Sequence, residues 1–277
     1  MTNAIRTAPR PRRPAAWKAV RLIPLTELSR SGRILGGMVM TSVQVLLFYW
    51  LWNAAYAARD TVADMDVANV VTYSTVAILF SRVRWNARAY SDDNVSHLVR
   101  SGSILYWFVR PLPAHRFHRL RATGEMVMGG SFALAGLVIA TLAGLASPPS
   151  SAAVAAVFLT SALLGQVIAY YLATLVDLLC FWLTANNSVT LMYNFVHDLM
   201  SGVFVPVFFF PGWLATLSSV LPFQAIISTP LSFYIGRTDL SSAPHQLSVQ
   251  LAWCVCLGLL VRVIWWFASR RLEIQGG

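Results

Sequence analysis

The residues of this chain whose side chains could do chemistry are polar groups inside apolar stretches. Asn194, Asp198 and Ser201 recur at i, i+4 and i+7, which places them on one face of a helix, and His197 lies beside them. In a membrane helix such groups are costly and have partners or functions. They either line a pathway with proton-sensitive chemistry or make hydrogen bonds between packed helices. We favour helix packing, the commoner use.

No arrangement of residues predicts an enzyme. Asp177 lies in another apolar stretch, where we expect a structural pairing with an arginine. Together with His197 and Asp198 it forms no nucleophile–base spacing and no metal-ligand motif. The three cysteines lie inside apolar runs and are expected to act as small hydrophobes, without a disulfide or a metal: Cys180, Cys254 and Cys256. We therefore expect no catalytic residue and no metal site.

The chain also lacks the residues that bind the phosphates of ATP. A P-loop needs glycines to cradle the phosphates and a lysine to reach them. The only lysine is Lys18, which follows Ala16 and Trp17. The sequence therefore predicts no ATPase motif and no cofactor in this chain. If ATP and magnesium are used, another polypeptide binds them.

The composition places these residues in a membrane protein. Of the 277 residues, 57% are hydrophobic and 12% are charged, and the mean hydropathy is +0.60. Soluble proteins carry about 25% charged residues. The uncharged runs are continuous rather than alternating, which indicates membrane-spanning helices and not a barrel. The predicted fold class is therefore an all-α integral membrane protein.

Six stretches are predicted to cross the bilayer within a membrane domain at 34–271. They lie at about 34–57, 67–81, 126–146, 152–183, 189–210 and 247–268. Residues 1–33 are expected to contain an amphipathic interfacial helix, and 272–277 to form a tail. The loop 82–125 separates the second and third spans. The proline-punctuated segment 211–240 is predicted to be re-entrant or interfacial on the extracellular side.

Arginine placement predicts the orientation. Cytoplasmic loops of membrane proteins carry an excess of Lys and Arg. With both termini in the cytoplasm, the predicted outer segments contain only Arg59 and Arg237 among the basic residues, and the other loops and ends hold clusters of arginine. The net charge of +10 is thus an orientation signal, and no nucleic-acid partner is expected.

The loop between the second and third spans is the most informative segment. It contains a short helical stretch at 96–100, a break at Ser101–Gly102, an apolar patch at 104–109 and then Arg110–Pro111–Leu112–Pro113. Exposed apolar and basic groups in such a loop suit a docking element for a cytoplasmic partner. They equally suit an interfacial helix that only satisfies the charge rule. The residue types leave both interpretations open.

The order Arg–Ser–Gly, a short apolar stretch and then Arg–Pro–Leu resembles the corresponding loop of ABC type-2 permeases. Six spans with cytoplasmic ends and an amphipathic helix before the first span also resemble that family. So does the stretch from Val220–Leu221–Pro222–Phe223 through Thr229–Pro230 to Tyr234–Ile235–Gly236. The resemblance covers most of the chain.

The resemblance implies an exporter permease of a bacterial inner (plasma) membrane. Two identical or homologous permease chains would form the pathway among membrane lipids, and each would dock on a nucleotide-binding ATPase subunit that holds ATP and magnesium. The surface helix at 17–31 and the loop helix at 94–112 would contact that ATPase. The implied docking residues are Trp17, Arg21, His97, Arg100, Ser101, Ile104, Trp107, Arg110 and Pro111.

Two other functions compete with the exporter. An ion- or proton-coupled secondary transporter would use His197 and Asp198, but such carriers often show internal repeats, and the two halves of this chain show no convincing one. An intramembrane enzyme would combine the same residues with Asp177. The ATP-driven exporter permease is the favoured hypothesis.

Overall fold

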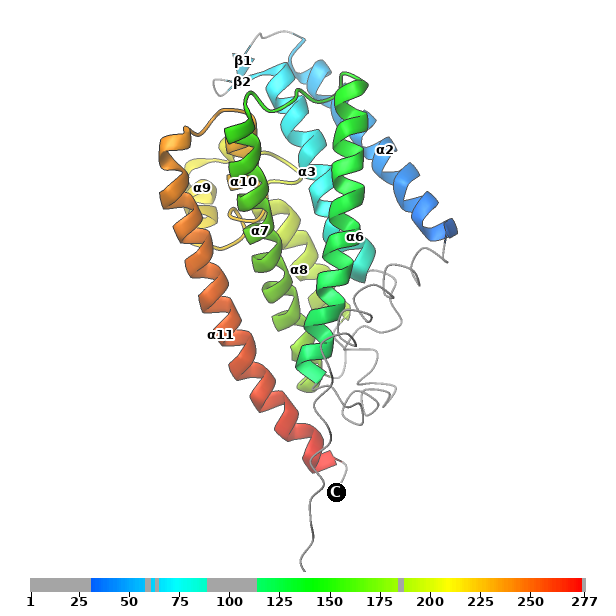
Figure 1. The fold of residues 1–277 in the computed structure, drawn as a ribbon, viewed down its shortest axis with the longest axis vertical. Helices are drawn as coiled ribbons and strands as arrows, with labels where there is room; N and C mark the ends of the chain where they lie inside the picture. Colours follow the sequence, from blue (N-terminus) through cyan, green and yellow to red (C-terminus); the bar gives the residue numbers. More distant parts are fainter. Residues whose placement is uncertain (1–30, 58–60, 63–64, 89–113, 184–186, 276–277) are drawn as a thin grey trace, which may run out of the picture.

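The computed structural model describes residues 31–57, 61–62, 65–88, 114–183 and 187–275. Over these residues the chain is helical apart from its loops and one hairpin of two short strands with two residues each (Figure 1). The elements are α2 (Ser31–Ala55), β1 (Thr61–Val62), β2 (Met65–Asp66), α3 (Val67–Arg88), α6 (Ala114–Leu142), α7 (Ala152–Leu178), η1 (Leu179–Phe181), α8 (Asn187–Met200), η2 (Val207–Phe209), α9 (Gly212–Val220), α10 (Ser228–Tyr234), η3 (Leu240–Ser242) and α11 (Ala243–Gln275).

Four of the described helices are long and apolar enough to cross a membrane. The apolar segments are Leu35–Ala55, Ala122–Leu142, Ala152–Phe181 and Leu240–Ala268. A shorter apolar helical segment, Val67–Val83, lies in α3. This confirms the predicted all-α membrane class. Large apolar side chains are exposed on α2, α6, α7 and α11, as expected for surfaces that face lipid or another membrane chain.

Successive long elements run in alternating directions, so the bundle has two distinct ends (Figure 1). At one end α2 begins, α3 ends, α6 begins and α11 ends, and we call it the basic end. Arginines occupy the terminal turns there, at positions 33, 84, 88, 116, 119, 121, 270 and 271. The opposite end, here the hairpin end, carries β1–β2, the α6–α7 turn and the described charged residues Asp66, Arg237 and Asp239.

The α3 helix lies at the centre of the bundle, although it is the least apolar of the predicted spans. Every residue from Val70 to Ile78 is buried. Its hydroxyl groups bond to neighbouring elements: Ser74 Oγ accepts from Trp52 Nε1 at 2.7 Å, and Thr72 Oγ1 accepts from the Ser147 amide at 3.0 Å. A helix surrounded by protein does not need a lipid-compatible surface, which explains its weak hydropathy.

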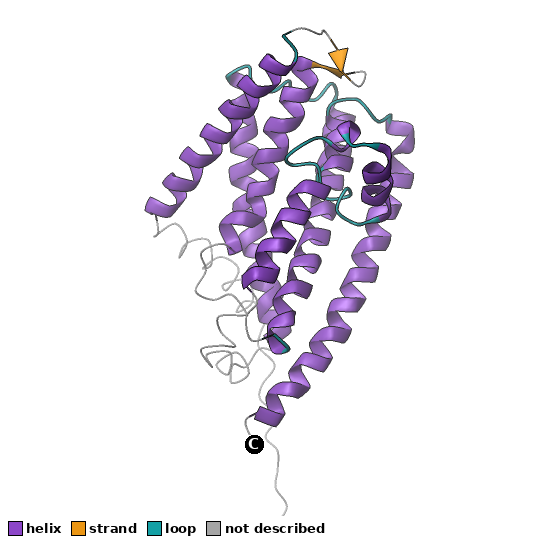
Figure 2. Cartoon of the chain, turned by 180° about the vertical axis from the view of Figure 1, so that it is seen from behind, coloured by secondary structure: helices purple, strands orange, loops and turns teal. Residues whose placement is uncertain are grey.

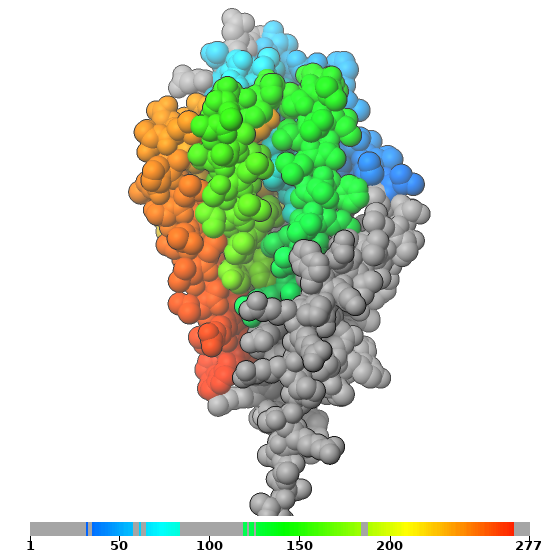
Figure 3. All heavy atoms as spheres, viewed as in Figure 1, coloured from blue at the N-terminus to red at the C-terminus, as the bar shows by residue number. Residues whose placement is uncertain are grey.

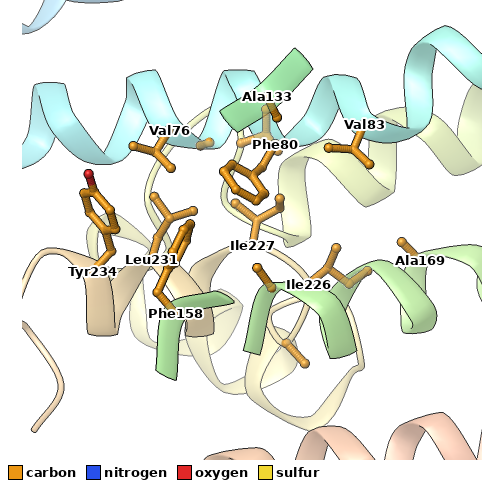
Figure 4. Packing of buried hydrophobic residues seen from close by; sticks show 14 of the residues in the cluster. Val76, Phe80, Val83, Ala133, Phe158, Ala169, Ile226, Ile227, Leu231 and Tyr234 are labelled. Atoms are coloured by element: carbon orange, nitrogen blue, oxygen red, sulfur yellow. The ribbon is translucent and has the colours of Figure 1, made fainter. Parts of the chain in front are cut away.

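Aromatic side chains join α3, α7 and α10 in the main core (Figure 4). The rings of Phe80 and Phe158 pack edge to face with centroids 5.1 Å apart, and Phe158 packs likewise on Tyr234 at 4.9 Å. Such edge-to-face pairs contribute about 0.5–1.5 kcal/mol beyond area burial. Ile227 and Leu231 fill the space around these rings. The short helix α10 is therefore part of the core.

Helix boundaries differ from the predicted spans at both sides of the predicted loop. The α3 helix continues beyond 81 to Arg88, and α6 begins at Ala114, within the stretch predicted as loop. The backbone hydrogen bonds of a helix do not depend on the membrane, so a helix can extend past the hydrocarbon region when its outer turns carry arginines. With 29 residues, α6 is about 43 Å long, which exceeds the hydrocarbon thickness of about 30 Å.

The α8 helix differs most from the predicted span at 189–210. It ends at Met200 after 14 residues, a length of about 21 Å, which is too short to cross the hydrocarbon core. The chain then continues through irregular backbone and the short elements η2, α9 and α10 (Figure 2). We call residues 201–235 the interrupted segment. Its buried parts, 201–203 and 225–228, agree with the rule that irregular backbone at membrane depth lies against protein, whereas α9 is exposed over most of its length.

Two contacts hold the interrupted segment against α7 and α11. Gly165 of α7 lies under the backbone of Ile226, where an added Cβ would be 2.6 Å from the Ile226 carbonyl oxygen. Gln250 of α11 donates from Nε2 to the Ala225 oxygen at 2.7 Å and to the Ser161 oxygen at 3.1 Å. Its Oε1 accepts from Ser161 Oγ at 3.0 Å. The buried amide thus joins three elements through three hydrogen bonds.

Replacing Gln250 with leucine should destabilise the protein by about 1–3 kcal/mol, because two buried carbonyl oxygens lose a donor. The measurement is the thermal unfolding midpoint of the purified chain in mild detergent. Gln246→Leu is the matched control, since Gln246 lies one turn earlier on α11 and is only half-buried. Equal midpoint shifts in the two variants would contradict this role of Gln250.

Candidate functional site

The end of α8 is a defined helix stop built around Gly202. This glycine has φ +87°, in the left-handed region that favours glycine. Its amide donates to the Leu199 oxygen at 3.2 Å, and the Val203 amide donates to the Asp198 oxygen at 3.1 Å. The two bonds are those of a Schellman motif, which satisfies the last carbonyls of a helix. The residues around Gly202 therefore end α8 by their own backbone hydrogen bonds.

Polar groups from three other elements surround this stop. The Ser228 amide, at the start of α10, donates to the Ser201 oxygen at 3.1 Å. Ser218 Oγ of α9 donates to the Met200 oxygen at 2.9 Å. The Tyr73 hydroxyl of α3 lies beside Ser228 and 2.6 Å from the place where a Cβ on Gly202 would lie. Tyr73 and Ser201 are fully buried, so the stop is sealed inside the protein.

His197 and Asp198 form a polar pair just before the stop. His197 Nδ1 and Asp198 Oδ1 are 2.9 Å apart. His197 is 3% exposed, and its ring lies between those of Tyr193 and Phe223, with centroids 5.9 and 6.1 Å away. Chemically the pair can hold the imidazole in one orientation and hold or release a proton.

The residues predicted for the α8 face are brought together only in part. Asn194 and Asp198 are half-buried, whereas His197, which was placed beside that face, is buried together with Met200. Ser201 lies just beyond the last helical residue, and its amide still makes a helical bond to the His197 oxygen at 2.9 Å. The face that enters the protein core is thus centred on His197. Asp177, on α7, is also buried.

The predicted docking residues lie outside the described residues. Trp17 and Arg21 precede residue 31, and the other seven fall within 89–113: His97, Arg100, Ser101, Ile104, Trp107, Arg110 and Pro111. The structure does describe the two helices that flank the second stretch. These are α3, which ends at Arg88, and α6, which begins at Ala114. Both helix ends lie at the basic end of the bundle.

Several residues that organise the site were not predicted from the sequence. Gln250 and Ser161 are polar residues within mostly apolar stretches, which is a detectable signal. Their pairing is not detectable, because the two residues are 89 positions apart. Tyr73 carries no distinguishing local pattern. Among the described residues no group of three or more His, Cys, Asp or Glu is placed to hold a metal ion.

Replacing Gly202 with alanine should cost about 2–4 kcal/mol of stability, as the sum of a left-handed backbone penalty and a clash with Tyr73. Gly212→Ala is the control, because nothing lies within 4 Å of an added Cβ there. The measurement is thermal unfolding of both variants and of the double variant Gly202→Ala with Tyr73→Phe. The double variant lacks the Tyr73 hydroxyl, so it separates the backbone penalty from the clash. If Gly202→Ala unfolds at the wild-type midpoint, the helix stop does not require glycine.

One comparison with known proteins identifies the family. Residues 39–276 match the family model described as "ABC-2 family transporter protein". No curated protein and no solved structure matches the chain. The match covers all the described helices except the first turns of α2. It agrees with the resemblance noted in the loop sequence and with the apolar helices of the bundle. The chain therefore belongs to the ABC-2 transporter family and is a multi-pass membrane permease of an ABC transporter.

Proposed function

We propose that this chain is the permease subunit of an ATP-driven exporter, that it forms half of a translocation pathway, and that a separate nucleotide-binding subunit drives it. The observation that carries the proposal is the gathering of arginine-bearing helix ends at the basic end of the bundle, around the two flanks of residues 89–113. By the charge rule this end faces the cytoplasm, where ATP is available. ATP and magnesium bind to the partner subunit.

Six crossings with cytoplasmic termini fit this arrangement. The four long apolar helices supply four crossings, and α3 supplies a fifth that is shielded by protein. The sixth consists of α8 and the interrupted segment, which returns the chain to the hairpin end before α11 begins. Such a chain lies in the bacterial inner membrane, beside an identical or homologous permease chain.

The helix α3 is well placed to transmit movement from a docked ATPase. It directly precedes residues 89–113, and it contacts α2, α6, α7 and α10. Close backbone approaches stiffen these contacts: a Cβ added to Gly129 of α6 would lie 2.5 Å from the Val83 oxygen. A displacement of the loop therefore shifts the core helix and, through Tyr73, the end of α8. Packed cores transmit such shifts because they deform little.

A proton-coupled secondary transporter is the second candidate. The observation that favours it is the 2.9 Å contact between His197 Nδ1 and Asp198 Oδ1 inside the bundle. The two functions differ in their energy source. Transport driven by a pH gradient without ATP would support the second candidate, whereas ATP hydrolysis that copurifies with the chain supports the first.

Replacing Trp107 and Arg110 together with alanine should lower the ATPase activity that copurifies with the tagged full chain by about tenfold or more. Aromatic and arginine anchors each contribute about 2 kcal/mol or more when they dominate an interface. Arg119→Ala is the control, because this exposed arginine at the start of α6 is not among the docking residues. Membrane insertion should be normal in all variants. Undiminished ATPase activity in the double variant would place the docking element elsewhere.

A further inference from the structure

Two buried hydroxyl groups at the end of α8 have no hydrogen-bond partner among the residues that the structure describes. They are Ser201 Oγ, just beyond α8, and the Tyr73 hydroxyl of α3. Both residues are 0% exposed. The Tyr73 hydroxyl lies beside Ser228 but outside hydrogen-bonding geometry. A hydroxyl group that is buried without a partner destabilises the conformation that buries it.

Comparable hydroxyl groups in the same part of the bundle are bonded. Ser218 Oγ, which is as buried as Ser201 Oγ, donates to the Met200 oxygen at 2.9 Å. The hydroxyl of Tyr234, a member of the main core like Tyr73, donates to the Ser147 oxygen at 2.9 Å. The two groups without a partner are therefore exceptions within a well-bonded region.

Close packing leaves no room for a water molecule beside Gly202. A Cβ added to this glycine would lie 2.6 Å from the Tyr73 hydroxyl oxygen and 3.1 Å from Val207 Cγ2. A buried water needs a space of its own and about two to four polar partners. On this side of the helix end the space does not accept even a methyl group. The protein itself must therefore move before the two hydroxyl groups gain partners.

The backbone at Gly202 provides a place for that movement. Its φ of +87° lies in a region that glycine enters as readily as the ordinary one. The two amide bonds that end the helix, from Gly202 and Val203, are 3.2 and 3.1 Å long. These lengths are at the long end of the range for such bonds, about 2.7–3.2 Å. A rotation at this glycine thus breaks only two long backbone bonds.

We propose that Gly202 is a hinge between two conformations of the α8 end, and that the hydroxyl groups of Tyr73 and Ser201 destabilise the described one, which keeps the second accessible. In the second conformation both hydroxyl groups bond to acceptors. A small free-energy difference between two states is what allows a partner to shift their populations. The inference rests on the proposed function, because an ATPase that displaces α3 also displaces Tyr73 and so selects between the two conformations.

Hydrogen exchange of the Gly202 and Val203 amides measures this equilibrium, in the full chain with its copurified partners in lipid nanodiscs. Both amides are bonded in the described conformation and exchange when the hinge opens. Ser201→Ala and Tyr73→Phe should each slow the exchange by about fivefold or more, because each removes a hydroxyl group that destabilises the described conformation.

Two matched controls lose a hydroxyl group that is bonded. Ser218→Ala should speed the exchange, and Tyr234→Phe should not slow it. Unchanged or faster exchange in Ser201→Ala and Tyr73→Phe would overturn the proposal, because their hydroxyl groups would then have partners such as water. Failure of these two variants to fold would overturn it for the same reason.

ATP hydrolysis distinguishes a failure of the hinge from a failure of the proposed function. The exchange measurement needs no ATP, so absence of a copurifying ATPase would contradict the proposed function and leave the exchange result standing. With the ATPase present, the double variant Tyr73→Phe with Ser201→Ala should lower ATP hydrolysis by about fivefold, because the described conformation is favoured. Undiminished hydrolysis together with slowed exchange would overturn the link between the hinge and the ATPase.

Discussion

The absence of water in a bilayer core is the constraint on which this structure depends. The chain between Ser201 and Ile227 is largely irregular, and each backbone group there needs a partner that lipid does not provide. The protein provides these partners both within the segment and from neighbouring helices. Gln250 donates to Ala225, and Ser218 donates to the last residue of α8. Gly165 lets the backbone of Ile226 lie directly against α7. Figure 3 shows α11 and α7, the two helices that contact this segment, beside α6 on one face of the molecule.

The same constraint explains which parts of the fold were predictable from the sequence. Apolar length alone indicated α2, α7 and α11, because helices that face lipid must be apolar. Apolar length gave too short a helix for α3, whose residues Thr72 and Ser74 bond through their hydroxyl groups to other parts of the protein. It also extended α8 too far, because the residues after Gly202 stay apolar. Glycine followed by Pro206 was a local stop signal within that run. The pairing of Gln250 with Ser161 depends on tertiary packing, which the sequence pattern does not encode.

The proposed function, a permease that a separate ATPase drives, needs a route from the docking stretch to the membrane helices. The described residues hold a central helix, α3, whose end leads directly into the stretch that carries the implied docking residues. That helix also contacts the stop of α8 through Tyr73. Under the proposed function, packed side chains along α3 would connect the basic end to the place where α8 ends. Broken helices are where membrane proteins place their pathways and their hinges, because the backbone there can rearrange without unwinding a whole helix.

The sidedness of the bundle is the central claim, and labelling of single cysteines in intact cells tests it most directly. In a functional background without the native cysteines, a cysteine at Arg119 lies at the basic end and one at Asp66 lies at the hairpin end, and both positions are exposed. The account predicts that a membrane-impermeant thiol reagent labels the cysteine at position 66 in intact cells, and that it labels the one at 119 only after the membrane is opened. Labelling of position 119 in intact cells would place the basic end outside, beyond the reach of a cytoplasmic ATPase, and would contradict the account.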